Sequence, residues 1–257
     1  MSPSFSIIPV LDIKGGVAVH AIAGLRDSYQ PLKTILHQGS RPIDVARSYR
    51  DRLGLSTLYL ADLDAIAGQP PNTRLYDALL DEGLDLWLDA GLRDREQAEG
   101  LCQRCGVSLV IGLESIQGPE EAVAILDRLG PDRVIFSVDQ SQGLLLTASP
   151  DAWTARTAIE MADALQALGF TRLLFLDLAR VGTGRGTGTD VLLQQLRPLL
   201  GDGPRQLFVG GGVSGLADLQ HLKAEGASGV LVGSVLHDGR VRRSELATLM
   251  LKPPTTG

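Results

Sequence analysis

The sequence repeats its landmarks once, at an interval of about half its length of 257 residues. Asp12 and Asp139 lie 127 residues apart, and each ends a short apolar run. Two further pairs of segments follow in the same order at offsets of 115 and 121 residues: Leu60–Leu63 with Phe175–Leu178, and Leu86–Gly91 with Leu207–Gly212. A repeat of this length predicts a duplicated half-domain, whereas periods of about 20–50 residues are typical of solenoids and propellers.

Short apolar runs alternate with longer amphipathic segments along the chain. The runs predicted to be strands are Ser6–Leu11, Thr57–Ala61, Asp85–Leu88, Leu109–Ile111, Arg133–Val138, Arg172–Leu176, Gln206–Val209 and Gly229–Val232. The segments predicted to be helices are Pro42–Leu53, Asn72–Glu82, Arg95–Cys105, Pro119–Leu129, Thr154–Leu168, Asp190–Leu200, Leu216–Glu225 and Ser244–Leu251. This alternation predicts an α/β fold, the parallel (β/α)8 or TIM barrel, built from two duplicated half-barrels.

An open, doubly wound sheet is the competing architecture. It would leave the internal repeat unexplained, and no glycine-rich dinucleotide fingerprint follows the first predicted strand. We therefore expect one barrel domain over residues 1–257, with half-barrels at about 5–130 and 131–251.

The composition narrows the range of partners. A net charge of −6 argues against nucleic acid and anionic membranes as partners. No apolar run has the length needed to span a bilayer, and the first residues lack the basic and apolar zones of a signal peptide. From these features we expect a cytoplasmic protein.

The two cysteines, Cys102 and Cys105, have the C-x-x-C spacing found in redox and zinc sites. The sequence has no second pair that would complete a zinc site. Both fall in a predicted helix that is followed by Gly106, so we interpret them as incidental thiols.

The two repeated aspartates are the candidate catalytic groups. In a (β/α)8 barrel the carboxyl ends of the strands form the face that carries the chemistry, and Asp12 and Asp139 would face each other across it. Two carboxyls in different environments can act as base and acid. The alternative is a structural role, as a helix cap or as the ion-pair partner of a basic residue such as Lys14. The symmetric pair favours proton transfer at a sugar carbon.

Glycines after the seventh and eighth predicted strands indicate a phosphate site. Gly211, Gly212 and Gly233 would let a phosphate approach the backbone, and Ser234 begins a short predicted helix. Barrels frequently bind phosphate at these two loops. The alternative is a tight turn that needs a positive φ angle.

The matching positions in the first half predict a second anion site with a different composition. Residues 89–91 stand at the position that corresponds to the glycines at 210–212, and the first of them is Asp89. A carboxylate there repels a phosphate. Gly91 and Arg93 are the candidate residues of this site, because Arg93 can neutralise Asp89 and grip a phosphate with two N–H groups. Whether such a site functions is left open.

Further polar residues and glycines follow the second and sixth predicted strands. They are Asp62, Asp64, Asp177, Arg180, Gly182 and Thr183. We interpret them as residues that surround the catalytic pair or belong to a substrate loop, where the aspartates would order basic loop residues or shape the pocket. Because no histidine stands near these carboxylates in the sequence, we predict no metal site.

Two connections are long enough to cover a ligand. One spans residues 14–39 after the first strand, and the other spans residues 180–189 after the sixth. Their glycines would let the loops close and expel water from a bound ligand. The alternative is that both are tolerant surface loops.

Together these motifs resemble the HisA/HisF family. This family contains phosphoribosylformimino aminoimidazole carboxamide ribotide isomerase and the cyclase subunit of imidazole glycerol phosphate synthase. The matching motifs are Pro9–Asp12 with P-A-L/I-D, Leu60–Asp64 with D-L-D, Gly91–Arg93 with G-G-I-R, Ser137–Asp139 with S-L/V-D, Gly182–Thr183 with D-G-T, and Gly210–Val213 and Gly233–Ser234 with the last phosphate site. The resemblance extends from Ile7 to about His237.

The resemblance implies a cofactor-free Amadori rearrangement that converts an aminoaldose to an aminoketose in histidine biosynthesis, a branch of amino-acid biosynthesis. It implies that Asp12 is the general base, that Asp139 is the general acid and that the partner is a small phosphorylated substrate. Features of the cyclase are missing, so we expect no glutaminase partner.

Departures from the family pattern leave two other hypotheses open. Leu176 and Val181 replace a threonine and an aspartate near the sixth strand, and Asp89 stands where glycine is usual. One hypothesis is a HisA-like paralogue that acts on a monophosphorylated substrate in another pathway, such as one-carbon cofactor biosynthesis. The other is a non-catalytic barrel that binds a phosphorylated ligand.

Overall fold

Eight parallel strands form a closed barrel in the part of the chain that the structure describes. The structure is a computed structural model, which describes residues 5–200 and 205–251. The barrel strands are β1 (Ser6–Lys14), β4 (Thr57–Asp62), β5 (Asp85–Asp89), β6 (Val107–Gly112), β7 (Val134–Ser141), β9 (Arg172–Asp177), β10 (Gln206–Gly210) and β11 (Gly229–Val232). Each pairs with the next, and β11 pairs with β1, which closes the sheet. The predicted (β/α)8 barrel is confirmed.

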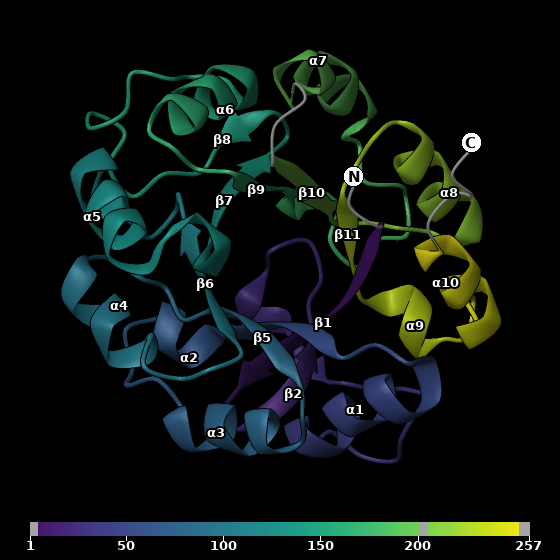
Figure 1. The fold of residues 1–257 in the computed structure, drawn as a ribbon. Helices are drawn as coiled ribbons and strands as arrows, with labels where there is room; N and C mark the ends of the chain where they lie inside the picture. Colours follow the sequence, from purple (N-terminus) through teal and green to yellow (C-terminus); the bar gives the residue numbers. More distant parts are fainter. Residues whose placement is uncertain (1–4, 201–204, 252–257) are drawn as a thin grey trace.

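Helices connect the strands and surround the barrel, as Figure 1 shows. The outer helices are α1 (Pro42–Ser48), α3 (Thr73–Asp81), α4 (Arg95–Leu101), α5 (Pro119–Leu129), α6 (Ala158–Ala167), α7 (Asp190–Leu200), α8 (Leu216–Ala224) and α10 (Arg243–Met250). Two short helices, α2 (Leu63–Ile66) and α9 (Ser234–His237), directly follow barrel strands. Within the described ranges, none of the helices combines the length and the apolar character needed to cross a bilayer.

The helix predicted over residues 95–105 is shorter in the structure. Helix α4 ends at Leu101, well before Gly106. The two cysteines therefore lie beyond the helix, with Cys102 buried and Cys105 exposed. Both are free thiols.

Helix α6 begins later than the predicted start at residue 154, because Thr157 caps it. The hydroxyl oxygen of Thr157 accepts a hydrogen bond from the N–H of Glu160 at 3.2 Å. The carboxylate of Glu160 accepts in return from the N–H of Thr157 at 3.3 Å. This reciprocal pair is a capping box, which satisfies N–H groups at the helix start.

Successive side chains along each strand point alternately into the barrel interior and towards the outer helices. Inward side chains form one apolar cluster that includes Ile8, Trp87, Ile135 and Phe208, in which the Trp87 ring meets Phe208 edge-on at a centroid distance of 4.7 Å. Outward side chains pack beneath the helices in a second, larger cluster. Asp12 lies four residues after Ile8, and Asp139 four residues after Ile135, so both aspartates share the inward phase.

The repeated landmarks occupy corresponding places around the barrel. Asp12 lies on the first barrel strand, β1, and Asp139 lies on the fifth, β7. Likewise, Asp62 ends the second strand and Asp177 ends the sixth. The duplication of two half-barrels stays a prediction.

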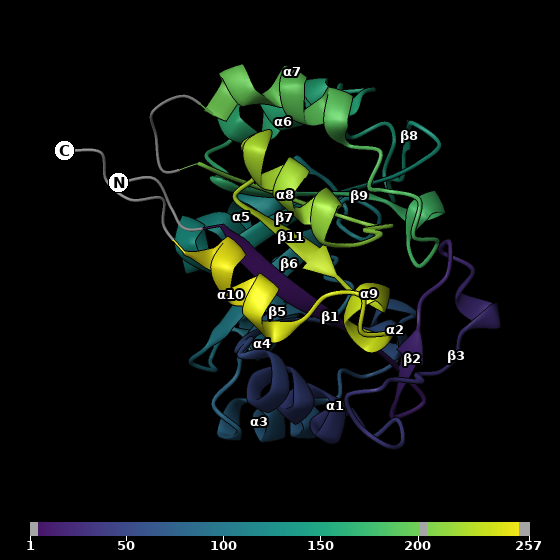
Figure 2. The same ribbon diagram turned by 90° about the vertical axis from the view of Figure 1, so that its right-hand side faces the viewer.

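The connection after β1 contains regular structure of its own. Strand β1 runs to Lys14, and β2 (Val17–His20) pairs with it in antiparallel orientation. A turn of 3-10 helix, η1 (Arg26–Ser28), and the short strand β3 (Gln30–Pro31) follow. Figure 2 shows β2, β3 and β8 (Leu144–Leu145) on the same side of the barrel as α2 and α9. This side carries the carboxyl ends of the barrel strands.

From the packing of the outer core we expect a large loss of stability when Phe136 is replaced. Its ring is fully buried on β7 and lies 5.1 Å from Phe170 and 5.8 Å from Trp153 between centroids. The substitution Phe136→Ala should lower the free energy of unfolding by about 3–5 kcal/mol, because it leaves a cavity that the barrel cannot fill. Urea unfolding measures this change. Leu144→Ala is the control, since Leu144 is 74% exposed, and equal losses in both variants would contradict the packing described.

Candidate active site

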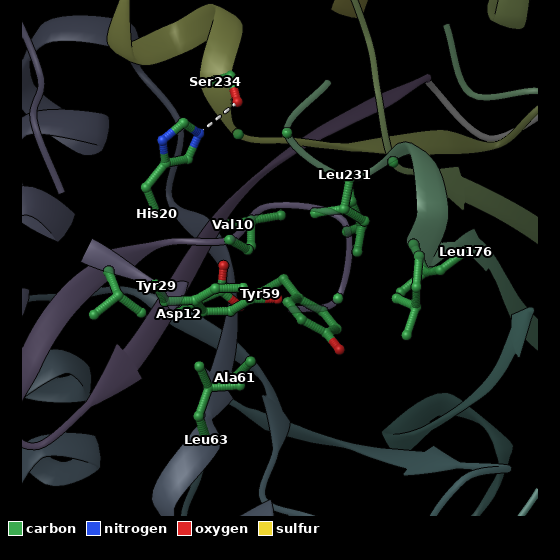
Figure 3. Close-up of a pocket in the computed structure, with 18 of the residues that line it drawn as sticks. Val10, Asp12, His20, Tyr29, Tyr59, Ala61, Leu63, Leu176, Leu231 and Ser234 are labelled. Carbon is green, nitrogen blue, oxygen red and sulfur yellow. Dashed lines mark hydrogen bonds between the residues drawn. The ribbon is translucent and has the colours of Figure 1, made fainter. Parts of the chain in front are cut away.

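One pocket opens at the carboxyl ends of the barrel strands. It is lined by Asp12 of β1 and Asp139 of β7, together with residues of the β1–α1 connection and of the loops that follow β9, β10 and β11. Figure 3 shows Asp12 with His20 and Ser234 on one side and with Leu63 on the other. The fold therefore brings the two candidate catalytic carboxyls to a common cavity.

Strand register explains why acidic side chains gather at this rim. Asp12 pairs with Ala61 of β4, and Ala61 pairs with Asp89 of β5, so these three residues occupy one level of the sheet. Further around the barrel, Asp139 pairs with Leu176 of β9. All five side chains line the pocket, because parallel strands in one closed barrel end at the same face.

Asp139 is buried and hydrogen-bonded on one side. Its residue is 6% exposed, and the Ser137 hydroxyl donates to its Oδ1 at 2.6 Å. Burial raises the pKa of Asp139 to about 7, and the negative charge of Glu114 adds to the rise, whereas the hydrogen bond from Ser137 opposes it. A carboxyl with a pKa near neutrality can donate a proton and recover it within one catalytic cycle.

Asp12 has a similar pKa for a related reason. Burial raises the pKa of Asp12 to about 7, the charge of Asp89 adds to the rise, and the charge of Arg26 opposes it. Lys14, the ion-pair partner considered from the sequence, instead donates to the carbonyl oxygen of Arg26 at 2.8 Å and lies 3.9 Å from Asp27. The Asp12 carboxyl borders the cavity, where a ligand can reach it.

All four residues of the predicted phosphate site line the same pocket. Gly211 and Gly212 have φ angles of +89° and +82°, and a Cβ on Gly212 would lie 2.5 Å from the carbonyl oxygen of Gly186. The turn therefore requires glycine even without a ligand, as the alternative interpretation held. Gly233 is different, because a Cβ there would meet no heavy atom of the described residues within 4 Å. Gly233 and Ser234 thus border open space in the pocket.

Two histidines lie at this end of the pocket. The Nε2 atom of His20 is 3.0 Å from the hydroxyl of Ser234, a contact drawn in Figure 3. The Nε2 atom of His237 is 3.0 Å from the Tyr49 hydroxyl, which itself donates to the carbonyl oxygen of Val10 at 2.9 Å. Since a hydroxyl has one proton, we assign Nε2 of His237 as the donor. Burial lowers the pKa of His20, and it lowers the pKa of His237 to about 4.

The other end of the pocket, lined by residues from the first half of the sequence, is acidic. Asp89 is 8% exposed, and its carboxylate accepts from the Tyr59 hydroxyl at 2.9 Å and from the N–H of Gly91 at 3.1 Å. Burial raises the pKa of Asp89 to about 6. Beyond β6, Glu114 forms an ion pair with Arg26 of η1. Among the described residues, no three His, Cys, Asp or Glu side chains are grouped to hold a metal ion.

The predicted second anion site, Gly91 and Arg93, lies outside the residues that line the pocket. Gly91 has a φ angle of +66°, and a Cβ there would lie 2.6 Å from the Cα atom of Ile66. The guanidinium of Arg93 donates to the carbonyl oxygen of Ile66 at 3.2 Å. Both residues therefore pack against the end of α2, and an anion site formed by them stays a prediction.

Asp62 and Asp177 act on the backbone just beyond their strands. Asp62 accepts from the N–H of Ala65 at 3.1 Å, and Asp177 accepts from the N–H of Ala179 at 3.1 Å. Asp177 also lies 3.5 Å from the Nε atom of Arg180. These three sequence-predicted residues do not line the pocket but hold the turns that border it.

The remaining predicted residues connect the two cover loops. Asp64 accepts from the N–H of Gly15 at 2.7 Å, which joins α2 to the loop after β1. Gly182 lines the pocket, and a Cβ there would clash with the carbonyl oxygen of Ala21. Thr183 donates to a carbonyl of its own loop at 2.7 Å. The loop at residues 180–189 is therefore in contact with the connection after β1.

Two residues of the site did not stand out in the sequence. Tyr59 reads as one more apolar strand residue, yet it shares the inward phase with Ala61, and its hydroxyl reaches Asp89 inside the barrel. The alternation of inward and outward residues along the strand is the sequence signal that could have identified Tyr59. His237 ends a four-residue helix, and only the folded chain places it beside Tyr49.

Comparison with known proteins identifies the family to which this barrel belongs. A model of the family described as "Histidine biosynthesis protein" matches residues 6–242. The match includes all eight barrel strands and every residue that lines the pocket. The chain belongs to this family.

Curated relatives of this family member align over almost their whole length. An uncharacterized protein of Methanocaldococcus jannaschii is 28% identical over 242 residues, which is 93% of this chain and 96% of the relative. The 1-(5-phosphoribosyl)-5-((5-phosphoribosylamino)methylideneamino)imidazole-4-carboxamide isomerase of Deinococcus radiodurans is 32% identical over 241 residues, covering 92% and 95%. The protein of the same name from Methanosarcina acetivorans is 32% identical over 246 residues, covering 92% and 94%.

The raised pKa values of three carboxyls at the barrel rim predict a loss of stability as the pH rises. Their folded-state pKa values are about 7, 7 and 6 for Asp12, Asp139 and Asp89, against 3.8 for an unperturbed aspartate. The folded protein thus binds more protons than the unfolded chain between about pH 4 and pH 7. The stabilisation is fully present below pH 4 and is lost as the pH rises through these folded-state values.

In Asp139→Asn this decline in the free energy of unfolding should become shallower, because one buried carboxyl no longer titrates. Urea unfolding at pH 5 and pH 8 measures the difference, with the exposed Asp81→Asn as the control. The same slope in the parent and in Asp139→Asn would show that Asp139 is not the buried titrating group inferred here.

Proposed function

We propose that this protein is an aldose–ketose isomerase that carries out an Amadori rearrangement of a phosphoribosyl amine, with Asp12 as general base and Asp139 as general acid. The observation that carries the proposal is the presence of two carboxyls in one barrel pocket, that of Asp139 buried and that of Asp12 half-buried, each with a pKa raised to about 7. Family membership and the isomerases among the relatives support the reaction class. The description of the family, "Histidine biosynthesis protein", supports a substrate from histidine biosynthesis.

The reaction needs one acid and one base on the same sugar. Ring opening breaks the bond between C1′ and the ring oxygen as the amine nitrogen forms a C1′=N double bond, and the ring oxygen takes a proton from Asp139. Asp12 then removes the proton from C2′, which gives an enol that carries the amine on C1′. Protonation at C1′ by the proton that Asp12 now carries, and loss of the enol proton to Asp139, complete the aminoketose and return both groups to their starting states. Both carboxyls can change protonation state near pH 7, since their pKa values lie close to it.

The glycine-lined end of the pocket is the proposed phosphate site. Gly211, Gly212, Gly233 and Ser234 come from the loops after the seventh and eighth barrel strands, where barrels frequently hold phosphate. Among the described residues that line the pocket, no carboxylate comes from these two loops. A phosphate bound there would hold the sugar between the two aspartates.

One observation favours a second candidate, in which the substrate has a single phosphate. The isomerase relatives are named for a compound with two phosphoribosyl groups. Here the first-half end of the pocket is lined by Asp89 and Glu114, which would repel a second phosphate. The second candidate keeps the barrel and both catalytic aspartates but acts on a monophosphorylated amine in another pathway.

Removal of either carboxyl should abolish most of the activity. We expect Asp12→Asn and Asp139→Asn each to lower kcat by about 10²–10⁴-fold, because each variant lacks one group that transfers a proton. The KM should change less, since the glycine-lined end is untouched. Rates are measured with the substrate named for the isomerase relatives and with monophosphorylated analogues, and Asp81→Asn is the control. Turnover of the accepted substrate within tenfold of the parent in both variants would rule out these roles.

A growth experiment separates the two candidates. The gene is introduced into a histidine-requiring strain that lacks the isomerase. Growth supports the histidine-pathway substrate, whereas failure to grow with folded protein present favours the monophosphorylated one. If Asp12→Asn/Asp139→Asn binds a phosphate ester as the parent does, and the parent turns over no substrate, the barrel is a binding protein and both candidates are wrong.

A further inference from the structure

Charged side chains are distributed unevenly in the pocket. Within the described part of the chain, four carboxylates line it, those of Asp12, Asp89, Glu114 and Asp139. Arg26 is the one arginine or lysine among the described residues that line it. Three of these carboxylates come from strands β1, β5 and β7, and the fourth comes from the loop after β6. Among the described residues, the loops that hold the glycines contribute no carboxylate to the pocket. One end of the pocket is therefore acidic, while the other is lined by glycine and neutral polar groups.

The acidic end is fixed in position by hydrogen bonds. The Tyr59 hydroxyl donates to Oδ2 of Asp89 at 2.9 Å, and the N–H of Gly91 donates to Oδ1 at 3.1 Å. Both donors favour the ionised carboxylate, so the charge of Asp89 is held at the wall of the pocket. A second phosphate would have to be bound against this charge and that of Glu114.

Arg26 is a cation already seated at the acidic end. Its guanidinium pairs with the carboxylate of Glu114, and the side chains of Arg26 and Glu114 are 41% and 21% exposed. Arg26 belongs to η1, in which no residue is buried, and its own carbonyl is held by Lys14 at 2.8 Å. The chain thus supplies this end with a positive group from η1, a turn with no buried residue, and a cationic ligand can exchange with that group at Glu114.

Apolar groups complete this end of the pocket. Ala61, Leu63 and Ile66 line it from β4 and α2. Figure 3 places Ala61 and Leu63 on the opposite side of Asp12 from Ser234. A ligand that extends from the glycine-lined end past Asp12 therefore meets a surface that is apolar on one wall and negatively charged on another.

We propose that Asp89 and Glu114 are specificity-determining residues, which select a substrate with a phosphate at one end and a protonated amine or amidine at the other. This inference rests on the second candidate of the proposed function, because it takes the glycine-lined end as the single phosphate site. It goes further by naming the chemical class of the substrate group that binds at the acidic end of the pocket. The ligand cation takes the place of the Arg26 guanidinium at Glu114, where the charge of Asp89 attracts it as it attracts Arg26.

Calorimetry with matched probes tests the proposal without any turnover. The probes are aminoalkyl phosphates with chains of two to six carbons, the hydroxyalkyl phosphates of equal length, and the corresponding alkane bisphosphates. We expect the best aminoalkyl phosphate to bind at least about tenfold more tightly than its hydroxyl counterpart, as a charge-assisted hydrogen bond in a half-buried site provides. The bisphosphates should bind more weakly than the amines.

Variants assign the preference to the two carboxylates. Glu114→Gln and Asp89→Asn should each reduce the preference for the amine to less than about threefold, while affinity for inorganic phosphate stays unchanged. Glu96→Gln, at an exposed position in the first turn of α4, is the control and should keep the full preference. Asp89 also orders Tyr59 and Gly91, so Glu114→Gln carries the test if Asp89→Asn fails to fold by circular dichroism.

Two results would overturn the proposal. Tighter binding of a bisphosphate than of every aminoalkyl phosphate would show that Arg26 serves a second phosphate. An amine preference that persists in Glu114→Gln would show that the carboxylate does not recognise the cation.

Failure of the proposed function gives a different result. If the parent binds no inorganic phosphate, the phosphate end is wrong, and propylammonium is then compared with propanol by NMR. A response in the Tyr59 ring to propylammonium alone that disappears in Glu114→Gln supports the cation subsite by itself. Equal responses to both probes would reject it.

Discussion

Parallel pairing between β1 and β11 is the contact on which the whole site depends. Residues 6–9 of the first strand pair with residues 229–232 of the last, which closes the sheet. Once the barrel is closed, all eight strands end at one face. Asp12, Asp139 and Ser234 are distant in the sequence, but they line a single pocket for this reason. An open sheet of the same strands would place Asp12 and Ser234 at different edges.

The closed rim also concentrates negative charge. Burial raises the pKa values of Asp12, Asp89 and Asp139 towards neutrality, and the negative charges of Asp89 and Glu114 add to the rise. Such groups oppose folding at high pH but exchange protons readily near pH 7. Stability comes from elsewhere, from the apolar layer between the strands and the outer helices. The carboxyls proposed for catalysis and the apolar side chains that stabilise the fold thus lie in different layers of the barrel.

Much of the fold could be predicted because it depends on local periodicity. All eight barrel strands and all eight outer helices overlap the elements predicted from the apolar pattern. Helix ends were less predictable, as the early end of α4 at Leu101 shows, because they depend on the contacts of the turn that follows. The strands β2 and β3 were predicted only as a loop, since β2 forms by pairing with β1 rather than by its own periodicity. In the site, the catalytic candidates were visible at strand ends, whereas the hydroxyl of Tyr59 and the ring of His237 were not.

The sequence by itself determined the class of the fold and the set of polar residues that end the strands, because both follow from alternation and repetition along the chain. Only the tertiary structure decided which of these residues share a cavity. Asp12 has the inward phase of its strand and lines the pocket, whereas Asp62 has the outward phase of the next strand and caps a helix. A shift of one residue reverses the face to which a strand side chain points. The pKa values were decided in the same way, since they depend on burial and on the charges of Glu114 and Arg26, which are neighbours only in the folded chain.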